Sequence, residues 1–249
     1  MCKIEPMKTV LLTGGSGGIG SAAALIFAKA GYNVAITYYK NLSGALHTQS
    51  LCREVGSDCH IFQGDLSSPS LCVSIVRQAK EALSRIDVLI HCAGKAYTGF
   101  FDETSEEMYD ALFDINMKSA FFITREVVKD MLSRKEGRII HVSSMWGLTG
   151  ASMEVAYSAS KAALNGFTKA LAKELAPSGI AVIGVAPGAV DTPMNAHLSL
   201  RDRTQLENEI PMGRFMTPEE IAKILLFAAS DEASSLTGQI LSPNGGLVL

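Results

Sequence analysis

A run of glycines directly after an apolar stretch constrains the fold of this chain more than any other feature. Residues 9–13 (T-V-L-L-T) are mostly apolar without alternation, as are strands of a parallel sheet that is buried on both faces. Residues 14–20 (G-G-S-G-G-I-G) follow at once and open an Ala-rich segment that closes at Gly31, which indicates a helix. Free amides and the helix dipole at such a turn favour an anion, so the stretch predicts a phosphate-binding turn.

Two glycine patterns overlap in this turn. Gly15, Gly17 and Gly20 satisfy G-x-G-x-x-G, whereas Gly14, Gly18 and Gly20 satisfy T-G-x-x-x-G-x-G. The second pattern better fits a turn that starts directly at the strand end. A P-loop is excluded because no Lys-Ser/Thr pair follows at the required position. A merely flexible glycine turn is the simpler alternative, and the flanking strand and helix favour nucleotide binding over it.

Apolar runs then alternate with helical patterns along the whole chain. Strands are predicted at 33–38, 59–63, 88–92, 138–143, 181–186 and 240–242, and helices at about 43–55, 69–84, 105–131, 157–175 and 218–229. Alternating strands and helices with short connections predict a parallel sheet with helices on both faces. No linker, repeat or low-complexity segment divides the 249 residues, and 47% of them are apolar, so we expect one α/β domain over 1–249.

Five residues of functional type directly follow predicted strands: Gly14, Asp65, Gly94, Ser144 and Pro187. In open parallel sheets, ligands bind at the carboxyl ends of the strands. The sequence therefore predicts one site at this end of the sheet, assembled from five strand ends.

Tyr157 and Lys161 supply the chemistry expected there. They stand four residues apart in a predicted helix, so both side chains lie on one face. An ammonium beside a phenol favours the phenolate, so we expect the pKa of Tyr157 to fall toward neutrality. Such a phenol can exchange a proton with a carbonyl or alcohol oxygen, and Ser144 can donate a second hydrogen bond to that oxygen. The motif alone is weak, because an exposed helix face with a solvated lysine gives the same spacing.

The residues after the second strand bear on the choice of cofactor. NAD-binding units usually place an acid about 20 residues past the glycines, where it holds the ribose 2′-hydroxyl. This chain has Tyr38, Tyr39, Lys40 and Asn41 there instead. A cation without a carboxylate suits a 2′-phosphate, so NADP(H) is favoured over NAD(H). Lys40 could equally be an ordinary surface lysine.

Charge and cysteine content exclude several other classes. The net charge is -3 and no basic stripe occurs, so nucleic acid is not an expected partner. No apolar run approaches ~18 residues and the N-terminus lacks a signal-peptide core, so we expect a soluble cytoplasmic protein without a membrane span. No metal site and no disulfide framework are expected, because the cysteines are odd in number and form no C-x-x-C pair: Cys2, Cys52, Cys59, Cys72 and Cys92.

The joint spacing of these motifs resembles the short-chain dehydrogenase/reductases over about residues 8–247. The resemblance rests on T-G-G-S-G-G-I-G, Asp65-Leu66, Ala93-Gly94, D-I-N-M-K-S-A-F, Ser144, Tyr157, Lys161 and P-G-A-V-D-T. It implies a single doubly wound Rossmann domain with a seven-stranded parallel sheet. It also implies an NADP-dependent oxidoreductase that interconverts C=O and CH-OH groups.

The resemblance implies a role for each matching residue. Tyr157 would be the general acid/base, Lys161 would lower its pKa and bond the nicotinamide ribose, and Ser144 would polarise the carbonyl. Asn116 would anchor a water that links Lys161 to solvent; its alternative is a helix residue that satisfies a nearby carbonyl. Asp65 would meet the adenine, Gly94 would leave room for the cofactor, and Thr192 would cover the nicotinamide. The full set of implied cofactor contacts is Gly14, Ser16, Gly17, Gly18, Ile19, Gly20, Tyr39, Lys40, Asp65, Leu66, Ala93, Gly94, Tyr157, Lys161, Pro187, Gly188, Val190 and Thr192.

One departure from the family pattern stands beside this site. The family commonly has Asn-Asn-Ala-Gly where this chain has His91-Cys92-Ala93-Gly94. The asparagines mainly brace the sheet, so the change concerns local hydrogen bonding rather than catalysis. We interpret His91 as a packed strand histidine and not as a catalytic base.

Two substrate classes are implied by resemblance. The ending G-Q-I-L-S-P-N-G-G resembles 3-oxoacyl-acyl-carrier-protein reductases, and S-S-M-W-G-L-T-G-A-S-M-E-V resembles a bacterial group that reduces a 5-aminopentanone modification on elongation factor P. Lys135 keeps one basic position of a carrier-protein docking surface, and Ser178 replaces the other. Glu154 suits an amine-bearing substrate, or is a solvated acid at a helix start. Trp146 and Met194 are further substrate candidates.

A lid and an oligomer are also expected. The polar, irregular stretch 193–211 follows Thr192 and is predicted to fold as a lid over the substrate. The helices at 105–131 and 157–175 carry more apolar surface than one sheet face needs, and family members pair through them, so we expect a homotetramer. A non-catalytic NADP(H) sensor is the alternative from another class, and such proteins typically lose the tyrosine, lysine or serine that this chain keeps.

Overall fold

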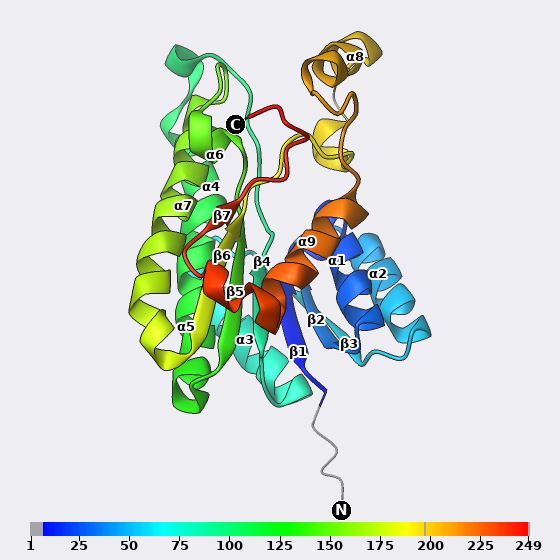
Figure 1. Cartoon of the computed structure of the whole chain (residues 1–249), viewed down its shortest axis with the longest axis vertical. Helices are drawn as coiled ribbons and strands as arrows, with labels where there is room; N and C mark the ends of the chain where they lie inside the picture. The colour runs from blue at the N-terminus through cyan, green and yellow to red at the C-terminus, as the bar shows by residue number, and fades with distance from the viewer. Residues whose placement is uncertain (1–6, 197, 249) are drawn as a thin grey trace, which may run out of the picture.

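The computed structural model describes residues 7–196 and 198–248, and these form a single parallel sheet flanked by helices (Figure 1). The seven strands lie in the order β3-β2-β1-β4-β5-β6-β7. Their bounds are β1 Thr9–Thr13, β2 Asn33–Tyr38, β3 Cys59–Gln63, β4 Val88–His91, β5 Gly137–Val142, β6 Ile180–Val185 and β7 Ile240–Leu241. The strand order reverses between β1 and β4, which is the switch point where doubly wound sheets bind ligands. The predicted Rossmann fold with seven strands is confirmed.

Helices cover both faces of the sheet, and adjacent strand residues point to opposite sides. Val10 and Leu12 of β1 pack with α1 Gly18–Lys29, α2 Leu42–Glu54 and α9 Pro218–Ala229. Leu11 points the other way, toward α3 Pro69–Leu83, α5 Ser119–Arg134 and α7 Val155–Leu175. Figure 1 shows α5 and α7 on one side of the sheet and α1, α2 and α9 on the other. Burial on both faces explains why the strands are apolar without alternation.

The predicted helix at 105–131 is divided in the structure. It consists of α4 Glu106–Phe113, a π-helical turn Asp114–Lys118 and α5 Ser119–Arg134. The π-helical turn holds the fully buried polar side chain of Asn116. A π turn widens the helix by one residue and is often found at functional sites. Helical periodicity alone does not reveal such an insertion.

The stretch 193–211 was expected to be irregular, and that expectation is wrong. It contains a 3-10 turn, Pro193–Asn195, and the helix α8 Leu200–Glu209. The Ser199 side chain caps α8 by accepting a hydrogen bond from the Asp202 amide. A further short helix that the sequence did not predict, α6 Trp146–Thr149, follows β5. Both α6 and α8 stand at the end of the sheet where the strands finish (Figure 1).

The findings on membrane-spanning helices, metal sites and cysteines concern only the described residues. Among the described residues, no helix is long and apolar enough to cross a membrane. Within those same ranges, no group of three His, Cys, Asp or Glu side chains is placed to hold a metal. Cys52, Cys59, Cys72 and Cys92 are free thiols, and Cys2 lies outside the described residues. The cytoplasmic location stays a prediction.

Candidate active site

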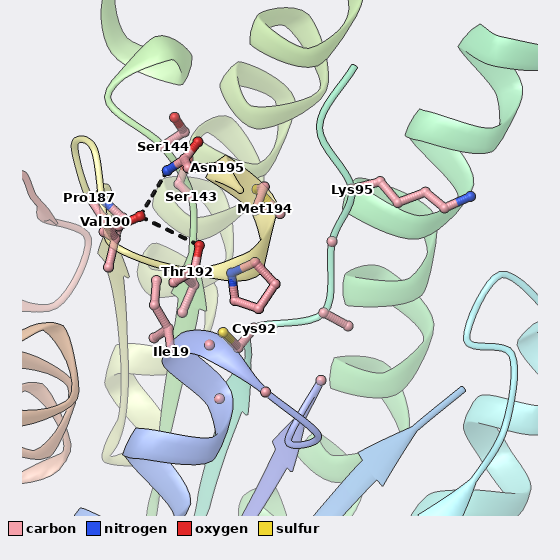
Figure 2. Close-up of a pocket in the computed structure, with 18 of the residues that line it drawn as sticks. Ile19, Cys92, Lys95, Ser143, Ser144, Pro187, Val190, Thr192, Met194 and Asn195 are labelled. Atoms are coloured by element: carbon pink, nitrogen blue, oxygen red, sulfur yellow. Dashed lines mark hydrogen bonds between the residues drawn. The ribbon is translucent and has the colours of Figure 1, made fainter. Parts of the chain in front are cut away.

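A pocket of about 390 Å³ opens at the carboxyl ends of β1, β4, β5 and β6. Most of the cofactor and catalytic residues predicted from the sequence lie on its walls: Gly14, Ser16, Gly17, Gly18, Ile19, Gly20, Ala93, Gly94, Ser144, Tyr157, Lys161, Pro187, Gly188, Val190 and Thr192. Met194, predicted as a substrate residue, also lines it. Figure 2 shows Ile19, Cys92 and Thr192 gathered from three separate segments around this space. Side chains far apart in the sequence therefore meet at the predicted end of the sheet.

The glycine turn is shaped by steric contacts and by open space. Gly14 has φ +73°, and a Cβ there would lie 3.0 Å from the Ala93 Cα; a Cβ on Gly20 would clash with the Gly14 carbonyl oxygen. Gly18 also has a positive φ, +52°. By contrast, no described atom lies within 4 Å of the position that a Gly17 Cβ would take. The three glycines of the T-G-x-x-x-G-x-G pattern thus serve backbone geometry, and Gly17 faces the pocket.

Asn41 is a pocket residue that the site prediction missed. Its side-chain Nδ2 donates to the Ser16 carbonyl at 2.9 Å, and its Oδ1 accepts from the Gly44 amide at 3.0 Å. It is the N-cap of α2, so it joins the glycine turn to the start of that helix. The available signal in the sequence was its position three residues after β2 and next to Lys40.

Four predicted cofactor residues do not lie on the pocket walls: Tyr39, Lys40, Asp65 and Leu66. The Lys40 ammonium lies 5.0 Å from the centre of the Tyr39 ring, and Tyr39 is 51% exposed. Asp65 accepts a hydrogen bond from the Ser67 amide at 3.0 Å, and hydrogen bonds from Ser67 lower the pKa of its carboxyl group. Leu66 is buried in the core. The first three form an outer rim at the ends of β2 and β3.

Tyr157, Lys161 and Ser144 meet on the inner wall. Tyr157 and Lys161 lie one turn apart on α7, and they are only 7% and 4% exposed. The Lys161 Nζ donates to the Val142 carbonyl at 3.0 Å and lies 5.8 Å from the centre of the Tyr157 ring. The Ser144 hydroxyl accepts from the Trp146 amide at 3.2 Å and shares a hydrogen bond with Tyr157. The predicted proximity of these groups is confirmed.

The expected fall in the pKa of Tyr157 is wrong for the protein alone. Burial raises the pKa of Tyr157 to about 12, and the Glu154 carboxylate adds to the rise, while the hydrogen bond with Ser144 opposes it. Burial also lowers the pKa of Lys161 to about 8. The Lys161 ammonium donates to the Val142 carbonyl on β5 and lies 5.8 Å from the centre of the Tyr157 ring, so in the protein alone it does not offset the effect of burial on the pKa of the phenol. The phenol is therefore protonated at neutral pH.

Asn116 lies behind the pocket and not on its wall. Its Oδ1 accepts from the Lys95 amide at 2.9 Å, and its Nδ2 donates to the Lys95 carbonyl at 2.9 Å and to the Ser160 hydroxyl at 3.0 Å. A Cβ on Gly94 would lie 2.8 Å from the Asn116 Oδ1 and 3.3 Å from the Lys161 Nζ. Asn116 thus satisfies backbone groups, which was the alternative role considered for it. The glycine at 94 is needed for this close approach.

His91 and Cys92, the two residues that differ from the family pattern, lie in different surroundings. His91 is fully buried between the Thr13 and Ser119 hydroxyls, which confirms a packed strand histidine. Cys92 lines the pocket, which the sequence did not predict, and burial raises the pKa of its thiol to about 11. Lys95, Val142 and Ser143 are further wall residues that the site prediction did not include, and Pro193 and Asn195 on the wall belong to the predicted lid stretch 193–211. The Asn195 side chain donates to the Val190 carbonyl at 2.8 Å (Figure 2).

Two predicted substrate residues flank the pocket without lining it. Trp146 begins α6, and Glu154 is the N-cap residue of α7, whose carbonyl accepts from the Ser158 amide at 2.8 Å. Glu154 is close enough to Tyr157 to raise the pKa of the phenol. The Glu154 carboxylate therefore acts electrostatically on the inner wall without lining the pocket.

The residues present fit a dinucleotide. The N-terminus of α1 and the open space beside Gly17 suit a pyrophosphate, because free amides and the helix dipole face that space. From there the pocket extends to Ser144, Tyr157 and Lys161, where a nicotinamide would meet a substrate. Hydride transfer with proton transfer from Tyr157 is the chemistry that this arrangement supports.

Known proteins similar to this chain share one family. Residues 8–203 match the family model described as short chain dehydrogenase. An uncharacterized oxidoreductase of Bacillus subtilis, YmfI, is 40% identical over 240 residues, which is 96% of this chain and 98% of that protein. The 3-oxoacyl-acyl-carrier-protein reductase FabG of Thermotoga maritima is 38% identical, with 97% of this chain and 98% of that protein covered.

A further relative and a solved structure extend this pattern. The acetoacetyl-CoA reductase of Allochromatium vinosum is 36% identical, with 97% of this chain and 99% of that protein covered. A crystal structure of an actinorhodin polyketide ketoreductase variant with NADPH superposes with a TM-score of 0.92 at 31% identity, covering 97% of both chains. The chain belongs to the short chain dehydrogenase family and is an oxidoreductase acting on CH-OH and C=O groups.

Proposed function

We propose that this protein reduces a ketone with NADPH and uses Tyr157 as the general acid. The observation that carries the proposal is that Ser144, Tyr157 and Lys161 lie on the same pocket as the glycine turn. The names of two relatives, a 3-oxoacyl-acyl-carrier-protein reductase and an acetoacetyl-CoA reductase, support a 3-oxoacyl thioester as substrate.

In this proposal each side chain has a defined task. With NADPH held in this pocket, its nicotinamide would supply a hydride to the carbonyl carbon. Tyr157, protonated at neutral pH because its pKa is about 12, gives its proton to the carbonyl oxygen as that oxygen becomes an alkoxide. Ser144 donates a hydrogen bond to the same oxygen. Lys161, with a pKa of about 8, is mostly charged at pH 7 and stabilises the phenolate left behind.

The direct test is NADPH oxidation with an acetoacetyl thioester, followed by absorbance. We expect steady turnover with NADPH and a 3-hydroxyacyl product. Tight NADPH binding without turnover on any 3-oxoacyl thioester would contradict this substrate class. If no ketone were reduced at all, the non-catalytic NADP(H) sensor would be the better account, although the three retained pocket residues argue against it.

The preference for NADP(H) over NAD(H) is part of the proposal. Lys40 and the N-terminus of α2, whose first turn reads L-S-G-A without an acid, lie next to the Asn41–Ser16 contact. We expect Lys40→Ala to raise the Kd for NADPH about tenfold, because a charged hydrogen bond to the 2′-phosphate is lost, and to leave the Kd for NADH unchanged. Calorimetric titration of both cofactors measures this.

The control for this prediction is Lys29→Ala, which removes another exposed lysine at the far end of α1. It should bind both cofactors as the wild type does. Equal losses of NADPH and NADH affinity in Lys40→Ala would show that Lys40 does not recognise the 2′-phosphate.

Reduction of a 5-aminopentanone group on elongation factor P is the second candidate. The observation that favours it is the carboxylate of Glu154 acting on the inner wall, since a nearby carboxylate attracts an amine and repels an anion. The distinguishing experiment compares kcat/KM for an acetoacetyl thioester with kcat/KM for the modified factor. A Glu154→Gln variant that loses activity only on the modified factor would favour this second substrate.

We propose that residues 193–211 act as a lid and that Arg203 holds it in place. On α8, the Arg203 guanidinium contacts Asp191 at 2.9 Å and Glu207 at 3.1 Å, and it lies 4.6 Å from the centre of the Phe215 ring. Asp191 is next to Thr192 on the pocket wall. Arg203 therefore ties the lid helix to the segment that lines the site.

Loss of this tie should affect the substrate more than the cofactor. We expect Arg203→Ala to raise the KM for the ketone about threefold to tenfold, because exposed ion pairs and a cation–π contact are each modest in energy. The Kd for NADPH should stay constant. Arg201→Ala, on the same helix, is the matched control and should have neither effect. An unchanged KM in Arg203→Ala would contradict the role of this arginine.

Assembly into a homotetramer is also proposed. An apolar, partly exposed surface on α4, α5 and α7 supports it: Phe121 is 42% exposed, Tyr109 is 46% exposed, and the Phe121 and Phe167 rings lie 5.5 Å apart. Exposed apolar patches of this kind mark protein–protein interfaces. Light scattering on the purified protein decides between tetramer, dimer and monomer, and a monomer would contradict the proposal.

A further inference from the structure

Two polar side chains support the turn 92–95 from opposite sides. The Thr13 hydroxyl, at the end of β1, accepts hydrogen bonds from the amides of Cys92 and Ala93, both at 3.0 Å. The Asn116 side chain accepts a hydrogen bond from the Lys95 amide and donates one to the Lys95 carbonyl, both at 2.9 Å. The turn between these supports forms part of the pocket wall.

His91 joins the two supports. Its Nδ1 lies 3.1 Å from the Thr13 Oγ1, and its Nε2 lies 3.2 Å from the Ser119 Oγ. The Ser119 hydroxyl contacts the Ile115 carbonyl at 2.5 Å, within the π-helical turn that also carries Asn116. A continuous hydrogen-bonded chain therefore runs from β1 through β4 to the π-helical turn.

The direction of every bond in this chain is fixed by counting donors and acceptors. The Thr13 oxygen already accepts two amide protons, so its own proton must be donated, and Nδ1 of His91 is the acceptor. A neutral imidazole that accepts at Nδ1 carries its proton on Nε2, which donates to Ser119. Ser119 in turn donates to the Ile115 carbonyl, which can only accept.

We infer that His91 is a positioning residue for the cofactor turn, held as the neutral tautomer with its proton on Nε2. In this form His91 accepts the Thr13 proton, so the Thr13 oxygen is oriented to accept from the amides of the turn 92–95. Its hydrogen bond with Ser119 links that turn to the π-helical turn that carries Asn116. It does not touch the pocket itself, so it acts through Thr13 and Asn116. The effect on NADPH rests on the proposed function, whereas the tautomer does not.

The surroundings of His91 keep it neutral. It is fully buried, and the groups near it are His141 on β5 and the Lys161 ammonium on α7. Burial and these two groups lower the pKa of His91 well below its usual value. The Thr13 and Ser119 hydroxyls beside it carry no charge, and a hydrogen bond with the Ile115 backbone, which raises the pKa of His91, does not offset the effect of burial. An imidazolium would also place a proton on Nδ1, opposite the Thr13 proton.

Nitrogen-15 NMR of the full-length protein labelled at histidine tests the tautomer directly. We expect His91 to show a pyridine-type Nδ1 and a protonated, pyrrole-type Nε2, and we identify its signal pair as the one that vanishes in the His91→Asn variant. A protonated Nδ1, or an imidazolium at neutral pH, would overturn the inference. This result is independent of whether the protein binds NADPH.

Cofactor affinity tests the positioning role. His91→Leu keeps the volume but leaves the Thr13 proton without an acceptor, so we expect the Kd for NADPH to rise about tenfold. His91→Asn, whose amide can accept from Thr13 and donate to Ser119, should restore most of the affinity. Equal affinity in the leucine variant and the wild type, or no rescue by asparagine, would overturn the role.

His141 provides a matched control. It is equally buried, lies in register with His91 on the adjacent strand, and bonds the Thr124 and Thr168 hydroxyls at 3.2 and 2.9 Å. Neither of these threonines belongs to the turn 92–95, so His141→Leu should lower the melting temperature as His91→Leu does but leave the Kd for NADPH nearly unchanged. Equal losses of affinity in both leucine variants would show general core damage and contradict the inference.

Discussion

Replacement of Tyr157 by phenylalanine is expected to slow ketone reduction by about 10²- to 10⁴-fold, the range for loss of a positioned general acid. The ring lies buried on the pocket wall, and only its hydroxyl is removed, so packing changes little. The Kd for NADPH should stay nearly constant, because Ser16, Gly17 and Gly18 on the opposite wall are unaffected. Single-turnover rates with an acetoacetyl thioester, measured beside cofactor titration, separate these two effects.

Tyr109→Phe is the control for this prediction. Tyr109 is 46% exposed on α4, away from the described pocket, and should tolerate loss of its hydroxyl. Wild-type turnover in Tyr157→Phe would contradict the assignment of Tyr157 as the general acid. Parallel loss of turnover and of NADPH affinity would assign Tyr157 to binding and not to proton transfer.

Alanine at Gly20 is expected to destabilise the fold and abolish cofactor binding together. A Cβ at this position would clash with the Gly14 carbonyl oxygen, which is backbone and cannot rotate away. Overpacking of this kind costs about 1–3 kcal/mol, and relief requires displacement of the glycine turn. Thermal unfolding should therefore show a lower melting temperature, and titration should show no NADPH binding.

The Gly17→Ala variant is expected to weaken NADPH binding without destabilising the fold. No described atom lies within 4 Å of the new methyl group, so the melting temperature should match the wild type. NADPH affinity should nevertheless fall, because the methyl group occupies the space assigned to the pyrophosphate. Gly166→Ala, in an exposed and equally open position on α7, should change neither affinity nor activity. Unchanged NADPH affinity in Gly17→Ala would place the cofactor elsewhere.

The strands could be predicted closely because their signal is local. Thr9–Thr13, Asn33–Tyr38 and Cys59–Gln63 have the predicted bounds. Of the later strands, β4 and β7 end one residue before the predicted end, and β5 and β6 begin and end one residue before the predicted bounds. The strands β1 and β2 are short apolar runs that are almost fully buried, which leaves no competing pattern, and β3 is a partly buried edge strand. The helix at 218–229 was equally clear, because Thr217 and Glu220 form a capping box with Pro218 at the first helical position.

Features that depend on tertiary contacts were not predictable. The π-helical turn at Asn116 exists because its amide reaches the Lys95 backbone, and no periodicity reports that contact. The helix α8 has a polar sequence, so its identity as a helix depends on the Ser199 cap and on Arg203 reaching Asp191. Local sequence alone left that segment irregular.

The site itself could be predicted to different depths. The glycine turn and the Ser144, Tyr157 and Lys161 cluster were found because strand ends and helical spacing determine where those side chains point. Asn41 and Cys92 were missed because their side chains reach the pocket through turns of unpredictable shape. The sign of the pKa shift of Tyr157 was wrong because burial outweighs a neighbouring charge that bonds elsewhere.

The most direct test of the central claim follows the hydride and not the residues. NADPH carrying deuterium at the transferring carbon is incubated with the protein and an acetoacetyl thioester, and the product is analysed by mass spectrometry. The account predicts a 3-hydroxyacyl thioester with one deuterium on the carbinol carbon in the wild type, and no such product over the same time in Tyr157→Phe. Binding of the labelled cofactor without deuterium transfer to any ketone would contradict it.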